Sequence, residues 1–320
     1  MAYGFVGVGV LLLLLGSEAL LHGGIGLSKQ LGLPHLLIGL VVVSAATSAP
    51  ELAVALEAAR AHPDIAIGCV VGGVIANILL VVGLGALIRP LPTPPKVVFR
   101  DGGIMLAATL AVLALAHEGG IGGTTALFLL GGFAVYLVVT FATEWRRPAQ
   151  STATEARAHC RDGDRSMALN LVYAVLGAAM TFLGARCLID GGVKVGELLN
   201  LPQATVGLTV VALATAVPEL VITVTAFARR YHDAVASHVM AANIFNLLVV
   251  LGLVALLRPL PIAPPLAQTD LLVMAGSAAV LMPLMIMSWR LSRLNGLFLM
   301  LCYGAYAAWI ASKFGFLHLG

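Results

Sequence analysis

Two glutamates lie in apolar stretches of the sequence, each directly after a proline. Glu51 ends the run Thr47-Ser48-Ala49-Pro50-Glu51, and Glu219 ends the run Thr215-Ala216-Val217-Pro218-Glu219. An ionisable side chain inside an apolar segment costs about 2.5–3.5 kcal/mol on membrane insertion, so such a residue usually faces a polar cavity or a partner. Two glutamates in equivalent settings therefore predict one site built from two halves.

The first motif supplies several oxygen donors on one helical face. Four residues have the spacing i, i+3, i+4, i+7, namely Ser44, Thr47, Ser48 and Glu51. Pro50 has no backbone N–H, so it frees the carbonyl of Ala46 and bends the helix, which at membrane depth requires a wet or protein-lined cavity. Carboxylate, hydroxyl and carbonyl oxygens suit Ca²⁺ or Na⁺. The structural alternative is a kinked helix whose hydroxyls bond to their own backbone, above all at Ser44.

The second motif is poorer in hydroxyls, and an amide accompanies each motif. Thr215 and Glu219 are kept, whereas alanines replace the two serines at positions 212 and 216. Asn77 and Asn246 lie in the apolar segments that follow the two motifs. We expect both amides beside the glutamates, although an asparagine in a membrane span can instead hold two helices together.

Composition shows what must position these residues. The chain has 320 residues, of which 60% are hydrophobic and 10% charged, and its mean hydropathy is +1.01. A soluble domain carries about 25% charged residues, so this composition predicts a polytopic membrane protein. The net charge of +3 gives no indication of nucleic-acid binding. The four cysteines occur singly, which is not the spacing of a metal-binding or disulfide framework.

The predicted fold is an all-α polytopic membrane protein with ten transmembrane helices. At about 20 residues for each span, the segments are 4–21, 33–59, 64–88, 102–117, 123–143, 167–189, 203–228, 233–257, 268–289 and 294–313. A polar linker at 144–166 divides the chain into a first five-helix repeat, 1–143, and a second, 167–320. With this linker in the cytoplasm, 13 Lys and Arg residues lie inside and 5 outside, which favours both termini outside.

The two halves repeat each other. At an offset of 168 residues, the first half matches the second at Gly39-Leu40 with Gly207-Leu208, Thr47 with Thr215, Pro50 with Pro218 and Glu51 with Glu219. Asp64, Asn77 and the run 89–92 match Asp233, Asn246 and the run 258–261 at an offset of 169. Upstream, Gly23-Gly24 and Leu33-Pro34 match Gly191-Gly192 and Leu201-Pro202. Because each half has an odd number of spans, the repeat is inverted, as in many secondary transporters with a midplane site on broken helices, here helices 2, 3, 7 and 8.

The repeated motifs resemble a known family. GLVVVSAATSAPEL with DIAIGCVVGGVIANILLVVG, and GLTVVALATAVPEL with DAVASHVMAANIFNLLVVLG, are similar to the two α-repeats of the cation/Ca²⁺ exchanger superfamily, here about 39–88 and 207–257. The prokaryotic sodium/calcium exchangers are the most similar members. The resemblance implies that Glu51 and Glu219 hold a divalent ion, helped by the main-chain carbonyls of Thr47 and Thr215. It places Asn77 and Asn246 at the centre, and Ser48 with the hydroxyl of Thr47 at a flanking Na⁺ site.

Three departures from this family bear on the counter-ion. Its members usually carry Gly-Ser-Asn on the third and eighth spans, where this chain has Gly72-Gly73-Val74 and Ala241-Ala242-Asn243, and Ala216 replaces a further serine. Three hydroxyls that would coordinate Na⁺ are therefore missing. Two carboxylates in a low dielectric repel each other, so protons could replace the metal, and His238 could accept one as well. A histidine bonded to a carbonyl is the alternative for His238.

Two further acids are weaker candidates for the site. Glu57 lies about 240° around the helix from Glu51 and does not share its face. Glu18 could pair with Arg186, its repeat mate.

These features predict a Ca²⁺ antiporter driven by Na⁺ or H⁺, working as a monomer in the bacterial inner membrane, with no cofactor and with the transported cations and the lipid bilayer as its partners. A proton-coupled exchanger that does not use Na⁺ and a passive cation channel are the alternatives. An intramembrane metalloenzyme would need a motif such as HExxH, which the sequence lacks.

Overall fold

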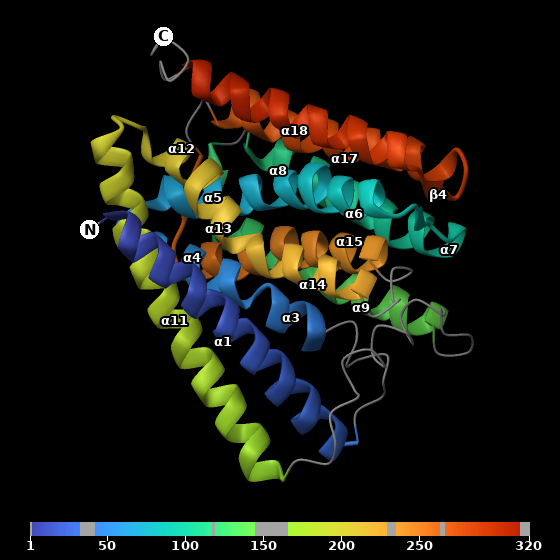
Figure 1. Cartoon of the computed structure of the whole chain (residues 1–320), viewed down its shortest axis with the longest axis horizontal. Helices are drawn as coiled ribbons and strands as arrows, with labels where there is room; N and C mark the ends of the chain where they lie inside the picture. Colours follow the sequence, from blue (N-terminus) through green and yellow to red (C-terminus); the bar gives the residue numbers. More distant parts are fainter. Residues whose placement is uncertain are drawn as a thin grey trace.

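The computed structural model describes residues 2–32, 42–116, 119–144, 166–228, 235–262 and 266–313. Within these ranges, nine helical stretches are long and apolar enough to cross a membrane. They are Ala2–Gln30, Pro63–Ile88, Pro95–Ala116, Gly123–Thr143, Met167–Leu198, Gln203–Val221, Val235–Leu257, Gln268–Ile286 and Arg293–Lys313. Each overlaps a predicted span, and a mostly helical membrane protein is thereby confirmed (Figure 1).

Some of the sequence predictions lie on residues outside these ranges. The predicted second span, 33–59, is described only from residue 42, so the count of ten stays a prediction. Most of the linker and the repeat residues Leu33-Pro34, Gly39-Leu40 and Asp233 also lie outside the described residues.

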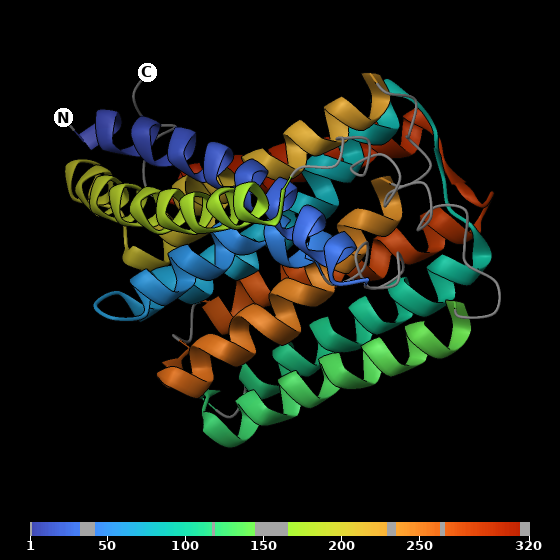
Figure 2. The ribbon, with the colours of Figure 1, turned by 90° about the horizontal axis from the view of Figure 1, so that it is seen from below.

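Helices α1 (Ala2–Gln30) and α11 (Met167–Leu198) are longer than predicted and lie side by side (Figures 1 and 2). We predicted spans of 4–21 and 167–189, but the glycine pairs near their ends do not stop the helices. A Cβ built on Gly16 would lie 2.5 Å from Thr181 Oγ1, and one on Gly23 would lie 2.5 Å from the backbone nitrogen of Ala174. Small residues thus let the two backbones approach closely, and the glycines serve packing here.

Two helical segments are interrupted at the Pro-Glu motifs. In the first half, α3 (Ser44–Thr47) ends before Ser48, and α4 (Ala49–Ala58) follows. In the second half, α12 (Gln203–Val206), a π-helical segment η4 (Gly207–Val211) and α13 (Ala212–Thr215) end before Ala216, and α14 (Val217–Ala228) follows. Each proline is the second residue of the helix that follows, where its missing N–H is tolerated.

The centre of the molecule consists of two buried segments. They are α5 (Pro63–Ala76), η2 (Asn77–Val81) and α6 (Val82–Ile88), and α15 (Val235–Phe245), η6 (Asn246–Val250) and α16 (Leu251–Leu257). A π-helical turn begins at Asn77 in one and at Asn246 in the other. Such turns are rare and often mark functional positions.

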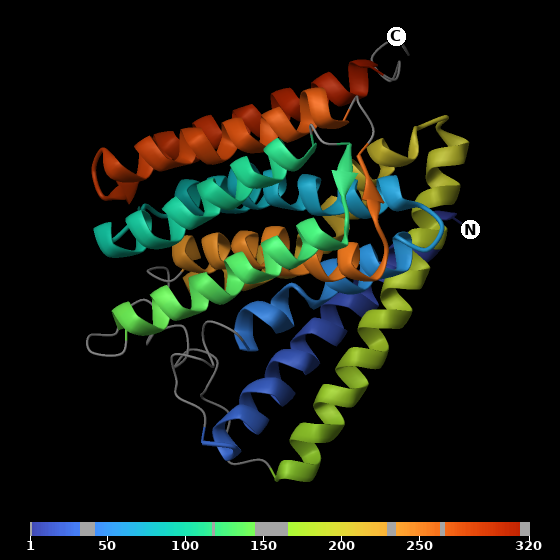
Figure 3. The same cartoon turned by 180° about the vertical axis from the view of Figure 1, so that it is seen from behind.

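Two outer hairpins complete the fold. The first contains α7 (Pro95–Val97), η3 (Val98–Gly102), α8 (Gly103–Ala116) and α9 (Gly123–Glu144), and the second contains η7 (Leu266–Asp270), α17 (Leu271–Ile286) and α18 (Arg293–Lys313). Their loops form two short antiparallel ribbons that join the halves of the chain. β1 (Leu91–Pro92) pairs with β4 (Arg290–Leu291), and β2 (Gly120–Ile121) pairs with β3 (Leu260–Pro261). The ribbons lie at opposite ends of the molecule (Figures 1 and 3).

Candidate cation site

Glu51 and Glu219 are completely buried. Each has an exposed fraction of 0%, and none of their four carboxylate oxygens has a hydrogen-bond partner among the described residues. The two carboxyl groups lie close enough for the charge of Glu219 to act on Glu51. A buried carboxylate without hydrogen bonds or a partner charge is strongly unfavourable. The pair therefore forms an acidic site that a cation would stabilise.

The helix breaks place both glutamates at helix starts. Glu51 lies in the first turn of α4, and Glu219 lies in the first turn of α14. Backbone N–H groups at a helix N-terminus favour a negative charge, whereas the carbonyls at the end of the preceding helix can face a cation. α4 packs against α5 and α13, which brings the first glutamate to the second half of the chain. The motif thus places an acid in the first turn of one helix, directly after the last carbonyls of the preceding helix.

Three amides lie beside this pair of helices. Asn77, Asn243 and Asn246 are fully buried, and Asn77 Nδ2 donates a hydrogen bond of 3.0 Å to Asn243 Oδ1. Asn77 Oδ1 and both polar side-chain atoms of Asn246 have no hydrogen-bond partner among the described residues. The predicted pair thus offers acceptor oxygens. Sequence reasoning did not assign Asn243 a role, although its place one turn before Asn246 could have indicated it.

The hydroxyls of the two motifs have different roles. The buried Oγ of Ser48 has no partner among the described residues. Thr47 Oγ1 donates to Ser44 O at 3.2 Å, and Thr215 Oγ1 donates to Ala212 O at 3.1 Å. Both threonine hydroxyls therefore bond to their own helices, as the structural alternative for such residues predicts, while their oxygens can still accept.

Two further side chains lie next to the motifs of the second half. Cys69 Sγ lies 3.7 Å from Thr215 Oγ1. His238 is buried, with an exposed fraction of 4%, and lies close enough to Glu219 for a protonated imidazole to interact with that carboxylate. Within the described chain, no three His, Cys, Asp or Glu side chains converge, so the site offers mainly oxygen donors. Oxygen donors suit hard cations such as Ca²⁺ and Na⁺.

Thr223 is a buried hydroxyl that the sequence analysis missed. Its exposed fraction is 1%, and its Oγ1 has no partner in the described part of the chain. It lies on α14 one turn after Glu219, and the spacing i, i+4, i+8 from Thr215 through Glu219 to Thr223 could have indicated it. On α14 the polar face therefore extends from Glu219 to Thr223, and Thr215 at the end of α13 precedes it.

The predicted pairing of Glu18 with Arg186 is wrong, because Arg186 pairs with Glu57. Arg186 Nε lies 3.4 Å from Glu57 Oε1, and Arg60 Nη1 lies 3.3 Å from Glu57 Oε2. Glu57 points away from Glu51, as its helical position predicted, and is therefore within reach of α11. Repeat position alone did not identify this contact, because it depends on the packing of α4 against α11.

Comparison with known proteins identifies the family. A model of the sodium/calcium exchanger protein family matches residues 1–142 and 169–311. The chain belongs to the sodium/calcium exchanger family. The family that the sequence predicted is thus confirmed.

Relatives of this family member match along nearly their whole length. The inner membrane protein YrbG of Escherichia coli is 30% identical over 95% of this chain and 94% of its own. The putative antiporter CaxA of Alkalimonas amylolytica is 30% identical over 91% of both chains. The sodium/calcium exchanger MaX1 of Methanosarcina acetivorans is 29% identical over 93% of this chain and 95% of its own.

A solved structure of the sodium-calcium exchanger NCX_Mj, soaked with Na⁺ and Sr²⁺, shares the fold. Its TM-score is 0.67 at 24% identity, covering 96% of this chain and 97% of the other. A structure of the same protein soaked with zero Na⁺ and Ca²⁺ gives a TM-score of 0.62 at 23% identity. At these identities the likeness extends to the fold alone.

One departure from the family pattern leaves space in the structure. Gly73 is buried at a position where the family resemblance implies serine, and a Cβ built on it meets no atom within 4 Å. Its neighbour Gly72 differs, because a Cβ there would lie 2.6 Å from Leu208 O. Position 73 thus has room for a hydroxyl that this family member lacks, whereas position 72 requires glycine for helix packing.

Proposed function

We propose that this protein is a secondary antiporter that exchanges Ca²⁺ for Na⁺ or H⁺ across the bacterial inner membrane. The burial of Glu51 and Glu219, with no hydrogen bond to any carboxylate oxygen among the described residues, is the observation that carries the proposal. Family membership and the names of the relatives, which include a sodium/calcium exchanger and an inner membrane protein, support it.

The proposed mechanism is exclusive occupancy. Either one divalent ion or the monovalent ions that replace it bind between the two glutamates. The loaded protein then changes conformation, so that the site opens to the other side of the membrane. Besides the glutamates, the proposed ligands are Thr47, Ser48, Asn77, Thr215 and Asn246. Because an unpaired buried carboxylate is costly, the empty and charged site is disfavoured, and uncoupled conversion is slow.

We also propose ten spans in two inverted repeats, working as a monomer with both termini outside. The paired ribbons support this arrangement, because each joins a loop of one half to a loop of the other. The π-helical turns at Asn77 and Asn246 support it as well. α1 begins and α18 ends at one end of the molecule, opposite α7 and β4 (Figure 1).

A second candidate is exchange with protons alone. The hydroxyls that the family resemblance implies at positions 73, 216 and 242 are absent, which removes oxygen donors for Na⁺ but not for Ca²⁺. Protons need no such donors, because they bind the carboxylates themselves.

Radiolabelled Ca²⁺ uptake into proteoliposomes under separate Na⁺ and H⁺ gradients tests the proposal. Uptake driven by an outward gradient of either ion supports an antiporter, and a response to the pH gradient alone selects the second candidate. Ca²⁺ flux that continues without any counter-ion gradient, at rates above those of a carrier, would replace the antiporter by a channel.

A further inference from the structure

The two ribbons are built alike but differ at one position. In one, the backbone nitrogen of Ile262 donates to Gly119 O at 3.2 Å, and in the other the nitrogen of Thr93 donates to Trp289 O at 2.9 Å. Gly119 has φ +90°, and Trp289 has φ +50°. A left-handed backbone is strained for a residue with a bulky side chain but not for glycine. A glycine adopts this left-handed conformation in one ribbon without strain. The backbone conformation therefore does not explain why the other ribbon has a tryptophan.

The indole of Trp289 does not contribute to the core. Its ring contacts that of Phe99 edge to face, with centroids 5.7 Å apart, and the exposed fractions are 38% for Trp289 and 63% for Phe99. Trp289 lies in the short loop between α17 and α18, two membrane-crossing helices, and Phe99 lies near the start of a third. The ring pair is therefore at the level where the helices leave the membrane, which is the depth that aromatic side chains favour.

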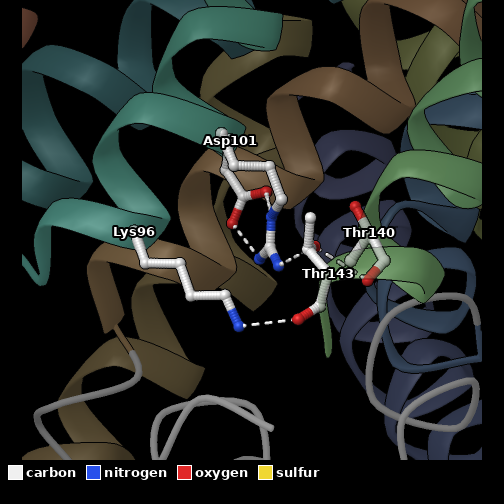
Figure 4. Close-up of polar contacts among 5 residues, drawn as sticks. Lys96, Asp101, Thr140 and Thr143 are labelled. Carbon is white, nitrogen blue, oxygen red and sulfur yellow. Dashed lines mark hydrogen bonds and ion pairs between the residues drawn. The ribbon is translucent and has the colours of Figure 1, made fainter. Parts of the chain in front are cut away.

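Arginines surround the same ribbon. Arg89, Arg290 and Arg293 are exposed, and none of them forms a salt bridge with a residue that the structure describes. The nearby Arg100 differs, because its Nε lies 2.6 Å from Asp101 Oδ1 (Figure 4). Three guanidinium groups thus lie on or beside the ribbon that carries Trp289, without a carboxylate partner among the described residues. Guanidinium groups bind phosphate oxygens well.

We propose that the β1–β4 ribbon is a binding surface for the headgroups of anionic phospholipids. Phe99 and Trp289 lie among the upper acyl chains, and Arg89, Arg290 and Arg293 contact the phosphates. The charge of the surface selects an anionic lipid, because cations without a carboxylate partner among the described residues attract acidic headgroups more strongly than the aromatic pair alone would. The β2–β3 ribbon has Gly119 and Gly120 at the matching place, so binding is confined to one leaflet. This inference is independent of the transported ion.

Tryptophan fluorescence tests the contact directly. In a variant with Trp145→Phe and Trp309→Phe, Trp289 is the only tryptophan of the chain. In vesicles, brominated phosphatidylglycerol is expected to quench its emission more than brominated phosphatidylcholine does. Arg290→Gln with Arg293→Gln is expected to remove this difference, while Arg258→Gln beside the other ribbon is expected to leave it. Equal quenching by the two lipids in the variant that keeps all arginines would overturn the proposal.

A stability measurement separates lipid binding from packing. Trp289→Gly relieves the left-handed strain, so its melting temperature in lipid-free detergent is expected to equal or exceed that of the unsubstituted protein. Added phosphatidylglycerol is expected to raise the melting temperature of the unsubstituted protein more than that of Trp289→Gly. A lower melting temperature of Trp289→Gly than of the unsubstituted protein in detergent would show that Trp289 has a packing role. The proposal would also be wrong if phosphatidylglycerol raised the melting temperature of both proteins equally.

Discussion

The amide of Asn77 donates a hydrogen bond of 3.0 Å to the amide oxygen of Asn243, a residue 166 positions further along the chain. This bond joins the buried segment of the first half to that of the second. It also orients the amide of Asn77, whose own oxygen has no partner among the described residues. Asn243 thereby positions a proposed ligand, and Asn243 Nδ2 lies 3.6 Å from Met105 Sδ.

Asn243→Ala is expected to weaken Ca²⁺ binding without abolishing transport. The variant leaves a buried amide donor of Asn77 unpaired, which costs about 1–3 kcal/mol. We expect a higher KM for Ca²⁺ uptake in proteoliposomes and a lower melting temperature. Asn243→Asp keeps the acceptor and is the matched control for the hydrogen bond. An unchanged KM in Asn243→Ala would show that this bond does not position Asn77.

Glu51→Gln and Glu219→Gln are each expected to reduce Ca²⁺ uptake to the background of empty vesicles. Each replacement removes a charge that the ion requires while keeping the size of the side chain. Folding is expected to be intact, since a neutral amide is less costly to bury than a carboxylate. Size-exclusion profiles and radiolabelled Ca²⁺ uptake check both statements.

Glu57→Gln is the matched control for these two variants. Glu57 lies on the same helix as Glu51 but faces Arg60 and Arg186. Its contacts are partly exposed ion pairs, which contribute about 0–1 kcal/mol. If Glu57→Gln transports Ca²⁺ fully and Glu51→Gln does not, the loss of transport results from the change at the cation site. Substantial uptake by Glu51→Gln or Glu219→Gln would contradict the assignment of these residues.

Gly73→Ser, combined with Ala216→Ser and Ala242→Ser, is expected to increase the response of Ca²⁺ uptake to a Na⁺ gradient. The three variants return hydroxyl oxygens that can coordinate Na⁺, and position 73 has room for the side chain. Uptake under an outward Na⁺ gradient is the measurement. Gly72→Ser is the control, because its Cβ would collide with Leu208 O and is expected to lower stability. A triple variant that folds but responds to Na⁺ no more than the parent would contradict this account of the counter-ion.

Lower pH is expected to raise the KM for Ca²⁺. Protons and Ca²⁺ compete for the same carboxylate oxygens, so apparent affinity falls as the proton concentration rises. Initial uptake rates over a pH series, with no pH gradient across the membrane, measure this effect. His238→Gln is expected to reduce uptake driven by a pH gradient more than Ca²⁺ binding at equilibrium. If the KM does not change with pH, protons do not share the site.

The sequence alone predicted the membrane class, the position of nine spans and the family. Apolar runs of about 20 residues and a repeated Pro-Glu motif depend on local composition and order, which are visible without a structure. The ends of the helices were harder to predict from the sequence. α1 continues past Gly23 to Gln30, because Gly23 packs closely against Ala174 of α11 within the helix. A contact of this kind between distant segments is not visible in the sequence.

The sequence determined which side chains could bind a cation: two glutamates, two asparagines and the hydroxyls near them. Only the tertiary structure decided which of these groups lie together and which are already bonded. Thr47 and Thr215 bond to their own helices, Asn243 lies against Asn77, and Arg186 is paired with Glu57 instead of Glu18. The physical reason is that periodicity fixes the face of a helix on which a residue lies, whereas the neighbour of that face depends on how helices far apart in the chain pack.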